Sequence, residues 1–177
     1  MRADKGFYFL LVALERMPAE LAARLSLTVA AKMTDPGALD CLRRIAHKFA
    51  AVTMVDGYTH ATLPGILAGV DLGIVPVLWE DNLPQVAIEM VGSGVPVLTS
   101  DLGGARELLN CPELTFRAGS RADFYAKLRG LLAAPDILRR AMIGRTRLFT
   151  PAEHYRTLRD EFYTAARGAS RLTRTAA

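Results

Sequence analysis

Long apolar runs, cysteine and histidine are all scarce in this chain of 177 residues. No uninterrupted apolar run reaches the roughly 18 residues that a membrane-spanning helix needs, because Gly, Asp and Pro interrupt the richest region, 63–78. Cys41 and Cys111 stand alone, without paired spacing or nearby clusters of histidine that would indicate a metal site. We therefore expect a cytoplasmic protein with reduced thiols and no bound metal.

The charge is distributed unevenly along the chain. Residues 1–119 hold 10 Lys/Arg against 13 Asp/Glu, whereas residues 120–177 hold 12 against 5. Two interpretations of the basic C-terminal third stay open. It forms a solvated helical face, or it attracts an anionic membrane surface or a phosphorylated lipid acceptor, which would make the protein peripheral at the inner membrane face. No aromatic residues interleave with the basic ones as in proteins that stack nucleic-acid bases, so nucleic-acid binding is not expected.

The apolar pattern predicts an α/β protein. A hydrophobic content of 51% excludes general disorder, and short apolar runs alternate with helical patterns, which is typical of a Rossmann-like parallel sheet with helices on both faces. We expect a single domain over 1–168, with further helices at its C-terminal end and a frayed basic tail over 169–177. The predicted strands are 25–30, 52–55, 72–78, 95–100 and 114–118. The predicted helices are 38–49, 61–70, 84–91, a helix opening after Gly103-Gly104, 120–133, 135–149 and 150–167.

Residues 71–107 form two consecutive strand–loop–helix units, and polar residues follow both strands. Open parallel sheets bind ligands beyond the carboxyl ends of their strands, so the two loops should emerge side by side at that edge. The first loop carries Asp81, with Glu89 eight residues later on the following helix. The second carries Gly103 and Gly104 at a helix start, where free amides favour an anion such as phosphate. This combination indicates a site for a nucleotide sugar or a nucleoside phosphate.

The combined pattern resembles the donor-binding, C-terminal half of a retaining glycosyltransferase of the GT-B type, in the glycosyl transferases group 1 family. That family places two acids eight residues apart, followed by a Pro-Val strand and a Gly-Gly-x-x-Glu helix start. Here these are Asp81 and Glu89, then Pro96-Val97, then Gly103-Gly104-Ala-Arg-Glu107. The chain departs from the family in having Asp where the first acid is usually Glu. It also has Asn82-Leu83-Pro84 in place of a glycine-rich turn, a variant expected among bacterial members.

The resemblance implies roles for particular residues in polysaccharide biosynthesis. It implies retaining transfer of a hexose from a UDP- or GDP-sugar, the donor substrate, to a growing glycan or lipid-linked saccharide. No metal or other cofactor is expected. Asp81 would contact the donor sugar and Glu89 the ribose, and these two are the candidate catalytic residues. The other residues expected at the donor are Lys5 on the diphosphate, Asn82, Leu83, Gly103 and Gly104 lining the site, and Glu107 holding the Gly-Gly loop.

One strand and one domain of the family are not found in this sequence. The family has a central strand immediately before its Lys-Gly loop, which here is Lys5-Gly6, and an N-terminal acceptor domain before that. We therefore expect a shortened or split gene product that works with an acceptor domain. Periodicity alone does not decide whether Phe7–Leu14 is a helix or a buried strand, although the resemblance favours the helix. Phe7–Leu14 or another chain could fill the strand position.

Two other functions fit parts of the pattern. The first is a non-catalytic module that binds nucleotide sugars or assembles with a partner, and the absence of the acceptor domain favours it. The second is a dinucleotide-dependent oxidoreductase, but its G-x-G-x-x-G fingerprint should follow a first strand, and Gly92-Ser93-Gly94 precedes a strand instead. His60 lies in a loop on the predicted ligand edge, where it would contact a nucleobase or phosphate, cap a helix or face solvent.

Overall fold

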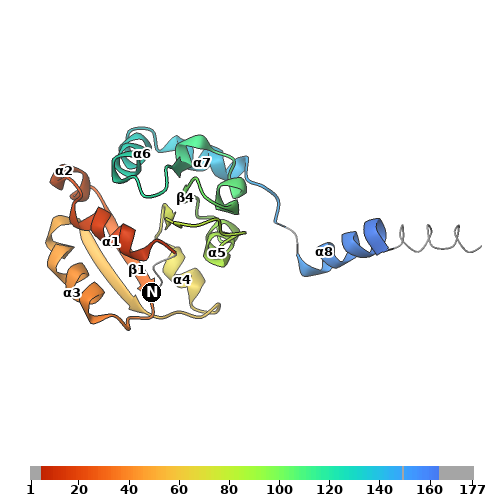
Figure 1. The fold of residues 1–177 in the computed structure, drawn as a ribbon, viewed down its shortest axis with the longest axis horizontal. Coiled ribbons are helices and arrows are strands. Elements are labelled where there is room, and N and C mark those ends of the chain that lie inside the picture. Colours follow the sequence, from red (N-terminus) through yellow and green to blue (C-terminus); the bar gives the residue numbers. More distant parts are fainter. Residues whose placement is uncertain (1–4, 149, 164–177) are drawn as a thin grey trace, which may run out of the picture. The chain divides into compact units, whose positions relative to one another are not determined.

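The protein is described here from a computed structural model, which covers residues 5–148 and 150–163 (Figure 1). The chain separates into two compact units, one within residues 1–146 and the other beginning at Arg147. The domain boundary near residue 168 stays a prediction.

The strands form two parallel sheets. β1 (Ser26–Ala31) pairs with β2 (Ala51–Asp56), and a second sheet has the order β3 (Gly73–Val75), β4 (Val97–Ser100), β5 (Thr115–Phe116). The expected α/β class with parallel strands is confirmed, and all five strands lie within a residue or two of the predicted segments or inside them. Among the described residues the strands are divided between these two sheets, which agrees with the expectation that one strand of the parallel sheet is not found in this sequence. β3 ends before Pro76, because proline has no N–H to continue a ladder.

Helices connect these strands. They are α1 (Phe7–Glu15), α2 (Ala19–Ala22), α3 (Pro36–Ile45), α4 (Leu63–Leu67), α5 (Gln85–Gly92), α6 (Arg121–Ala133) and α7 (Asp136–Ile143), with short 3₁₀ turns η1 (Ala46–Lys48), η2 (Gly104–Leu108) and η3 (Pro112–Leu114). The helix expected after Gly103-Gly104 is only the 3₁₀ segment η2. The predicted helices over 61–70 and 135–149 are also shorter in the structure.

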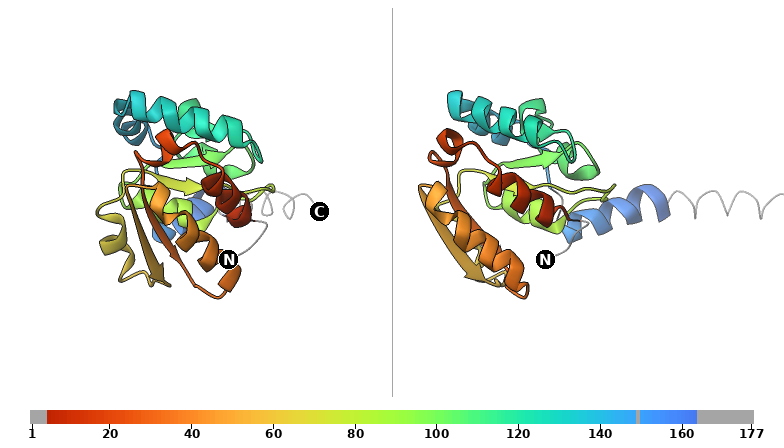
Figure 2. Two further views of the ribbon diagram at one scale, coloured as in Figure 1. Left: turned by 90° about the vertical axis from the view of Figure 1, so that its left-hand side faces the viewer. Right: turned by 60° about the vertical axis from the view of Figure 1, so that its left-hand side comes forward.

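The segment Phe7–Leu14 lies in helix α1, so the strand alternative is wrong. Leu11 and Leu14 lie one turn apart on its buried face. They join a core that α1 shares with α3, α6, β4 and β5, with Leu42, Leu98, Phe116 and Phe124 almost fully buried. In Figure 2, α1 and α3 lie side by side along the β1–β2 pair, and α6 covers the second sheet.

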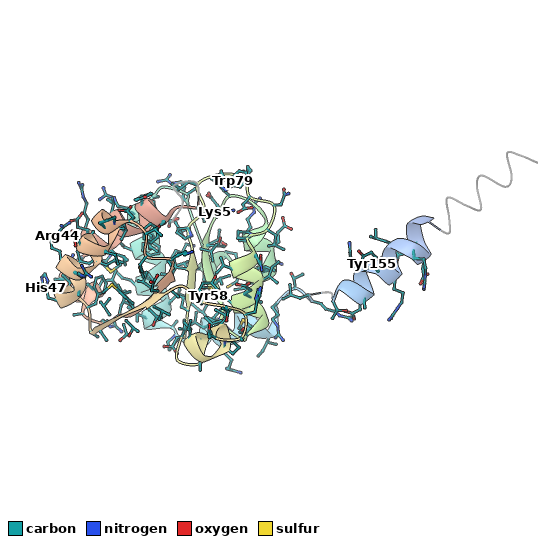
Figure 3. The ribbon with its side chains drawn as sticks, turned by 90° about the horizontal axis from the view of Figure 1, so that it is seen from below. Lys5, Arg44, His47, Tyr58, Trp79 and Tyr155 are labelled. Atoms are coloured by element: carbon teal, nitrogen blue, oxygen red, sulfur yellow. The ribbon has the colours of Figure 1, made fainter. Side chains whose placement is uncertain are left out.

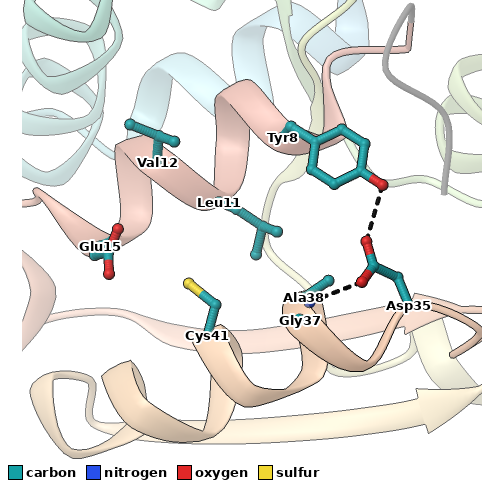
Figure 4. A pocket seen from close by; sticks show the side chains of 8 residues that line it. All are labelled: Tyr8, Leu11, Val12, Glu15, Asp35, Gly37, Ala38 and Cys41. Carbon is teal, nitrogen blue, oxygen red and sulfur yellow. Dashed lines mark hydrogen bonds between the residues drawn. The ribbon is translucent and has the colours of Figure 1, made fainter.

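A tyrosine on α1 reinforces the start of α3. The Asp35 carboxylate accepts the N–H of Ala38 at 3.2 Å, which caps α3, and also the Tyr8 hydroxyl at 2.9 Å (Figure 4). The hydrogen bond from Tyr8 is the largest cause that lowers the pKa of Asp35 below its ordinary value. The same bond, strengthened by the carboxylate charge, raises the pKa of Tyr8.

Replacing Tyr8 with phenylalanine should therefore raise the pKa of Asp35 toward its ordinary value. A carboxyl whose pKa is lowered by folding stabilises the folded state above its unfolded pKa, and that contribution is lost as the pH falls through the folded pKa. The ¹³C chemical shift of the Asp35 carboxyl, followed through acidic pH in both proteins, measures the change. An identical titration in the Tyr8→Phe variant would contradict the assignment.

The second unit begins its described structure with a capped helix. The Thr150 hydroxyl accepts the N–H of Glu153, and Glu153 accepts the N–H of Thr150, which is the capping box of α8 (Pro151–Thr157). A π-helical turn, η4 (Leu158–Tyr163), follows. The predicted helix 150–167 is confirmed as far as 163, and its end and the predicted tail 169–177 lie outside the described residues. None of the helices in 5–148 and 150–163 combines the length and the apolar content needed to cross a membrane.

Candidate functional site

The start of α1 lies against the carboxyl end of β3. Gly6 has a left-handed backbone with φ of 76°. A Cβ atom on Gly6 would lie only 1.6 Å from the carbonyl oxygen of Pro76. Only glycine fits this approach, because it has no Cβ and tolerates positive φ. The close packing brings Lys5 over the loop that follows β3.

Lys5 makes an ion pair with Asp81 in that loop. The Lys5 ammonium donates to Oδ2 of Asp81, and its Nζ lies 5.1 Å from the centroid of the Trp79 ring (Figure 3). Asp81 is buried, with 9% of its surface exposed, whereas the Lys5 side chain is 39% exposed. A buried carboxylate needs a paired charge, so Lys5 compensates Asp81, while part of the Lys5 side chain stays exposed to solvent. The structure thus brings together two residues 76 positions apart in the sequence.

The turn at Gly103 and Gly104 packs directly on the Asp81 loop. The N–H of Gly103 donates to the Glu80 carboxylate at 2.9 Å, and the N–H of Gly104 donates to the Asp81 carbonyl at 2.9 Å. A Cβ on Gly103, whose φ is 70°, would lie 2.2 Å from the Asp81 carbonyl oxygen, and one on Gly104 would lie 2.0 Å from that of Asn82. Both glycines therefore have a packing role, and both amides have partners within the protein. An anion at Gly103 would have to displace Glu80.

Glu89 lies on α5 beside the loop that follows β2. Its side chain is 15% exposed. Its Oε1 atom accepts the side-chain amide of Gln85 at 2.9 Å and lies 3.4 Å from Nδ1 of His60. Burial, followed by the charge of Glu89, raises the pKa of the Tyr58 hydroxyl. One carboxylate oxygen of Glu89 is thus held by neighbours, in a setting where the other can accept hydrogen bonds from a ligand.

The remaining predicted site residues have different surroundings. Asn82 and Leu83 are exposed in the loop before α5. Glu107 is exposed on η2, and its backbone carbonyl accepts the Thr146 hydroxyl at 2.5 Å. Among the described residues, no hydrogen bond joins the Glu107 carboxylate to the Gly103-Gly104 turn. Glu80 holds that turn instead.

Sequence reasoning missed Glu80, Trp79 and Tyr58. Glu80 and Trp79 immediately precede Asp81, but nothing in their spacing distinguishes them from solvent-facing loop residues. Tyr58 is two residues from His60, in a loop that the pattern already placed at the ligand edge. An aromatic residue in such a loop is the one signal that could have indicated its position near Glu89.

Two hollows on the molecule are lined by neither Asp81 nor Glu89. A shallow groove of about 280 Å³ lies between α1 and α3 and is lined by Tyr8, Glu15, Asp35, Cys41 and their neighbours (Figure 4). A second, near η2, is lined by Arg106, Glu107, Asn110, Cys111, Pro112 and Thr115. Within the part of the chain that the structure describes, no three side chains of metal-binding type gather at one point. Metal-independent binding stays a prediction.

Solved structures with a similar fold are glycosyltransferases of the expected GT-B type. Sucrose-phosphate synthase from Thermosynechococcus elongatus matches with a TM-score of 0.60 and 21% identity, over 80% of this chain and 36% of that one. Anabaena Alr3699/HepE in complex with UDP and glucose matches with a TM-score of 0.59 and 16% identity, over 99% of this chain and 46% of that one. The catalytic domain of starch synthase IV from Arabidopsis thaliana, bound to ADP and acarbose, matches with a TM-score of 0.65 and 17% identity. The match covers 93% of this chain and 36% of that one. This chain therefore spans less than half the length of each.

The sequence comparison agrees with the fold. A search of curated proteins found no match. Residues 1–134 match the family described as "Glycosyl transferases group 1". This match covers most of the chain and includes both loops of the site, so the chain belongs to the glycosyl transferases group 1 family.

Proposed function

We propose that this chain is the donor-binding half of a retaining glycosyltransferase. It binds a nucleoside-diphosphate sugar, and the sugar is transferred to an acceptor such as a growing glycan or a lipid-linked saccharide. An acceptor-binding domain outside this chain completes the reaction site. The observation that carries the proposal is the meeting of Lys5, Asp81 and the Gly103-Gly104 turn at the carboxyl edge of β3 and β4, where open parallel sheets bind nucleotides. Two of the similar structures contain such ligands: Anabaena Alr3699/HepE is in complex with UDP and glucose, and starch synthase IV is bound to ADP and acarbose.

Each charged group has a task in this proposal. The unshared oxygen of Glu89 accepts the ribose hydroxyls. Lys5 turns from Asp81 toward the diphosphate and stabilises the negative charge that develops on it as the glycosidic bond breaks. Asp81, released in part from Lys5, accepts a hydroxyl of the donor sugar. The exposed amides of Asn82 and Leu83 line the same side of the site.

A second candidate is a module that binds a nucleotide sugar without catalysing transfer. The observation in its favour is that Lys5 and the amides of Gly103 and Gly104 already have partners within the protein, which leaves fewer groups free to stabilise a leaving group. Donor binding without transfer in the presence of an acceptor-binding domain would favour this candidate.

The test uses the single tryptophan of the chain, Trp79, which is 47% exposed and lies beside Lys5. Its fluorescence is titrated with UDP, GDP and ADP and with the corresponding hexose conjugates. We expect saturable quenching by one diphosphate. In the wild type the sugar conjugate should bind more tightly than the diphosphate. In the Asp81→Ala variant the two ligands should bind with the same affinity. Asp40→Ala, an exposed acid on α3, is the matched control. If no nucleotide changes the fluorescence or the melting temperature, the proposal is wrong.

A further inference from the structure

The side chain of Glu80 links the two loops of the candidate site. Glu80 lies in the loop after β3, and its Oε2 atom accepts the N–H of Gly103, 23 positions later in the sequence, at 2.9 Å. Glu80 is exposed to solvent, whereas the adjacent Asp81 is buried. Of these two consecutive acids, the exposed one thus holds the backbone of the second loop, and the buried one pairs with Lys5.

The backbone of Asp81 is held by the same turn. The N–H of Gly104 donates to the Asp81 carbonyl at 2.9 Å, and the N–H of Asp81 donates to the Trp79 carbonyl at 2.8 Å. Because Gly103 and Gly104 are consecutive, the turn binds the Glu80 side chain and the Asp81 carbonyl through two neighbouring donors. A side chain that acts at a precise position needs such a supporting set of hydrogen bonds. Glu80 therefore restrains the direction in which the Asp81 side chain leaves the loop.

Lys5 is another restraint on Asp81. The Lys5 ammonium donates to Oδ2 of Asp81, but in the proposed function Lys5 turns toward the diphosphate when a donor binds. The Asp81 carboxylate then loses its cation at the moment when it has to accept a hydroxyl of the sugar. The hydrogen bonds made by Gly103 and Gly104 do not involve Lys5. The restraint that Glu80 provides therefore matters most when the sugar is bound.

We propose that Glu80 is a positioning residue for the donor sugar. Through its hydrogen bond with Gly103 it keeps the loop in the orientation in which the Asp81 carboxylate meets a sugar hydroxyl. Glu80 itself contacts neither the sugar nor the diphosphate. A displacement of about 1 Å is enough to lose most of the effect of such a polar contact. This inference rests on the proposed function, because it concerns how the same site distinguishes a nucleoside-diphosphate sugar from the free diphosphate.

The test measures one ratio in the intact chain: the dissociation constant of the diphosphate divided by that of its sugar conjugate. Equilibrium dialysis gives both constants without using Trp79, the neighbour of Glu80. The ratio should exceed one in the wild type. In Glu80→Ala it should fall to within twofold of one, while the affinity for the diphosphate changes less than twofold. Glu80→Gln should keep the wild-type ratio, because its amide oxygen can still accept the N–H of Gly103. Asp71→Ala, which removes an exposed acid before β3, is the matched control and should keep it too.

A double variant tests whether Glu80 acts through Asp81. Two residues that act through one contact are not additive, so adding Glu80→Ala to Asp81→Ala should leave the ratio where Asp81→Ala alone puts it. The ratio also separates positioning from a loss of stability. A smaller fraction of folded protein lowers the apparent affinities for the diphosphate and the sugar conjugate by the same factor, and the ratio then stays unchanged.

Four outcomes would overturn this inference alone. A wild-type ratio in Glu80→Ala would mean that the contact with Gly103 does not position Asp81. A lost ratio in Glu80→Gln would assign the effect to the charge of Glu80. Tighter binding of the diphosphate by Glu80→Ala would mean that Glu80 competes with an anion at Gly103. A further change of the ratio when Glu80→Ala is added to Asp81→Ala would place Glu80 in contact with the sugar. A wild type that binds no nucleotide would instead overturn the proposed function, and this inference with it.

Discussion

Glu89→Ala is expected to weaken nucleoside-diphosphate binding by about a hundredfold and to leave the fold intact. A hydrogen bond to a charged group contributes about 1.5–3 kcal/mol. In the proposed contact, two ribose hydroxyls donate to one carboxylate. A hundredfold loss of affinity corresponds to about 2.7 kcal/mol, which lies within that range. Glu89 does not belong to the hydrophobic core, and Gln85 and His60 are its polar neighbours, so we expect the core packing to survive the truncation. Titration of Trp79 fluorescence measures the dissociation constant.

Gln85→Ala is the matched control for this experiment. It removes the amide that orients Glu89 but leaves the carboxylate, so it should weaken binding by less than tenfold. The 2′-deoxy form of the preferred nucleotide should lose affinity for the wild type but not for Glu89→Ala. Wild-type affinity in a folded Glu89→Ala variant would mean that Glu89 does not contact the ribose.

Gly6→Ala is expected to destabilise the chain by about 2–5 kcal/mol. A left-handed backbone costs a residue with a side chain about 1–2 kcal/mol. The new Cβ would also lie 1.6 Å from the Pro76 carbonyl oxygen, so α1 must move away from β3, at a further cost of about 1–3 kcal/mol. The total is a large part of the stability of a typical domain. The midpoint of urea unfolding, compared with that of the wild type, measures it.

Gly119→Ala separates the two contributions. Gly119 has a φ of 72°, close to the 76° of Gly6, but nothing lies within 4 Å of its Cβ position. Replacing Gly119 with alanine should therefore lower the free energy of unfolding only by the cost of the left-handed backbone, about 1–2 kcal/mol. Equal losses in the two variants would show that the approach of Gly6 to Pro76 does not contribute. Lys5 should also lose its contact with Asp81 in Gly6→Ala alone.

Local sequence patterns were sufficient to predict the five strands of this fold and the positions of most helices. Each buried strand is a short apolar run, and α3 begins where Asp35-Pro36 predicts a helix start. The predicted pairing of the Asp81 loop with the Gly103-Gly104 turn is confirmed in outline, because consecutive parallel strands bring their carboxyl ends to one edge. The family and fold expected from these motifs are confirmed as well.

Long-range partners were not predictable in the same way. Lys5 and Asp81 are far apart in sequence, and only the packing of Gly6 on Pro76 joins them. The role expected for Glu107 is taken by Glu80 because the 3₁₀ geometry of η2 leaves Glu107 in solvent. The state of Phe7–Leu14 was undecided because an apolar run of that length fits a strand and a helix equally well.

The fit of Gly103 and Gly104 against the backbone of Asp81 and Asn82 has a thermodynamic consequence. The two loops are packed against each other without a ligand. The backbone carbonyls of Asp81 and Asn82 lie so close to Gly103 and Gly104 that neither glycine has room for a side chain. A ligand that reaches Asp81 then meets a rigid loop, and association loses little conformational entropy there. Calorimetry of a loosened turn would therefore show a more unfavourable entropy of binding, even where the enthalpy of the new contacts is unchanged.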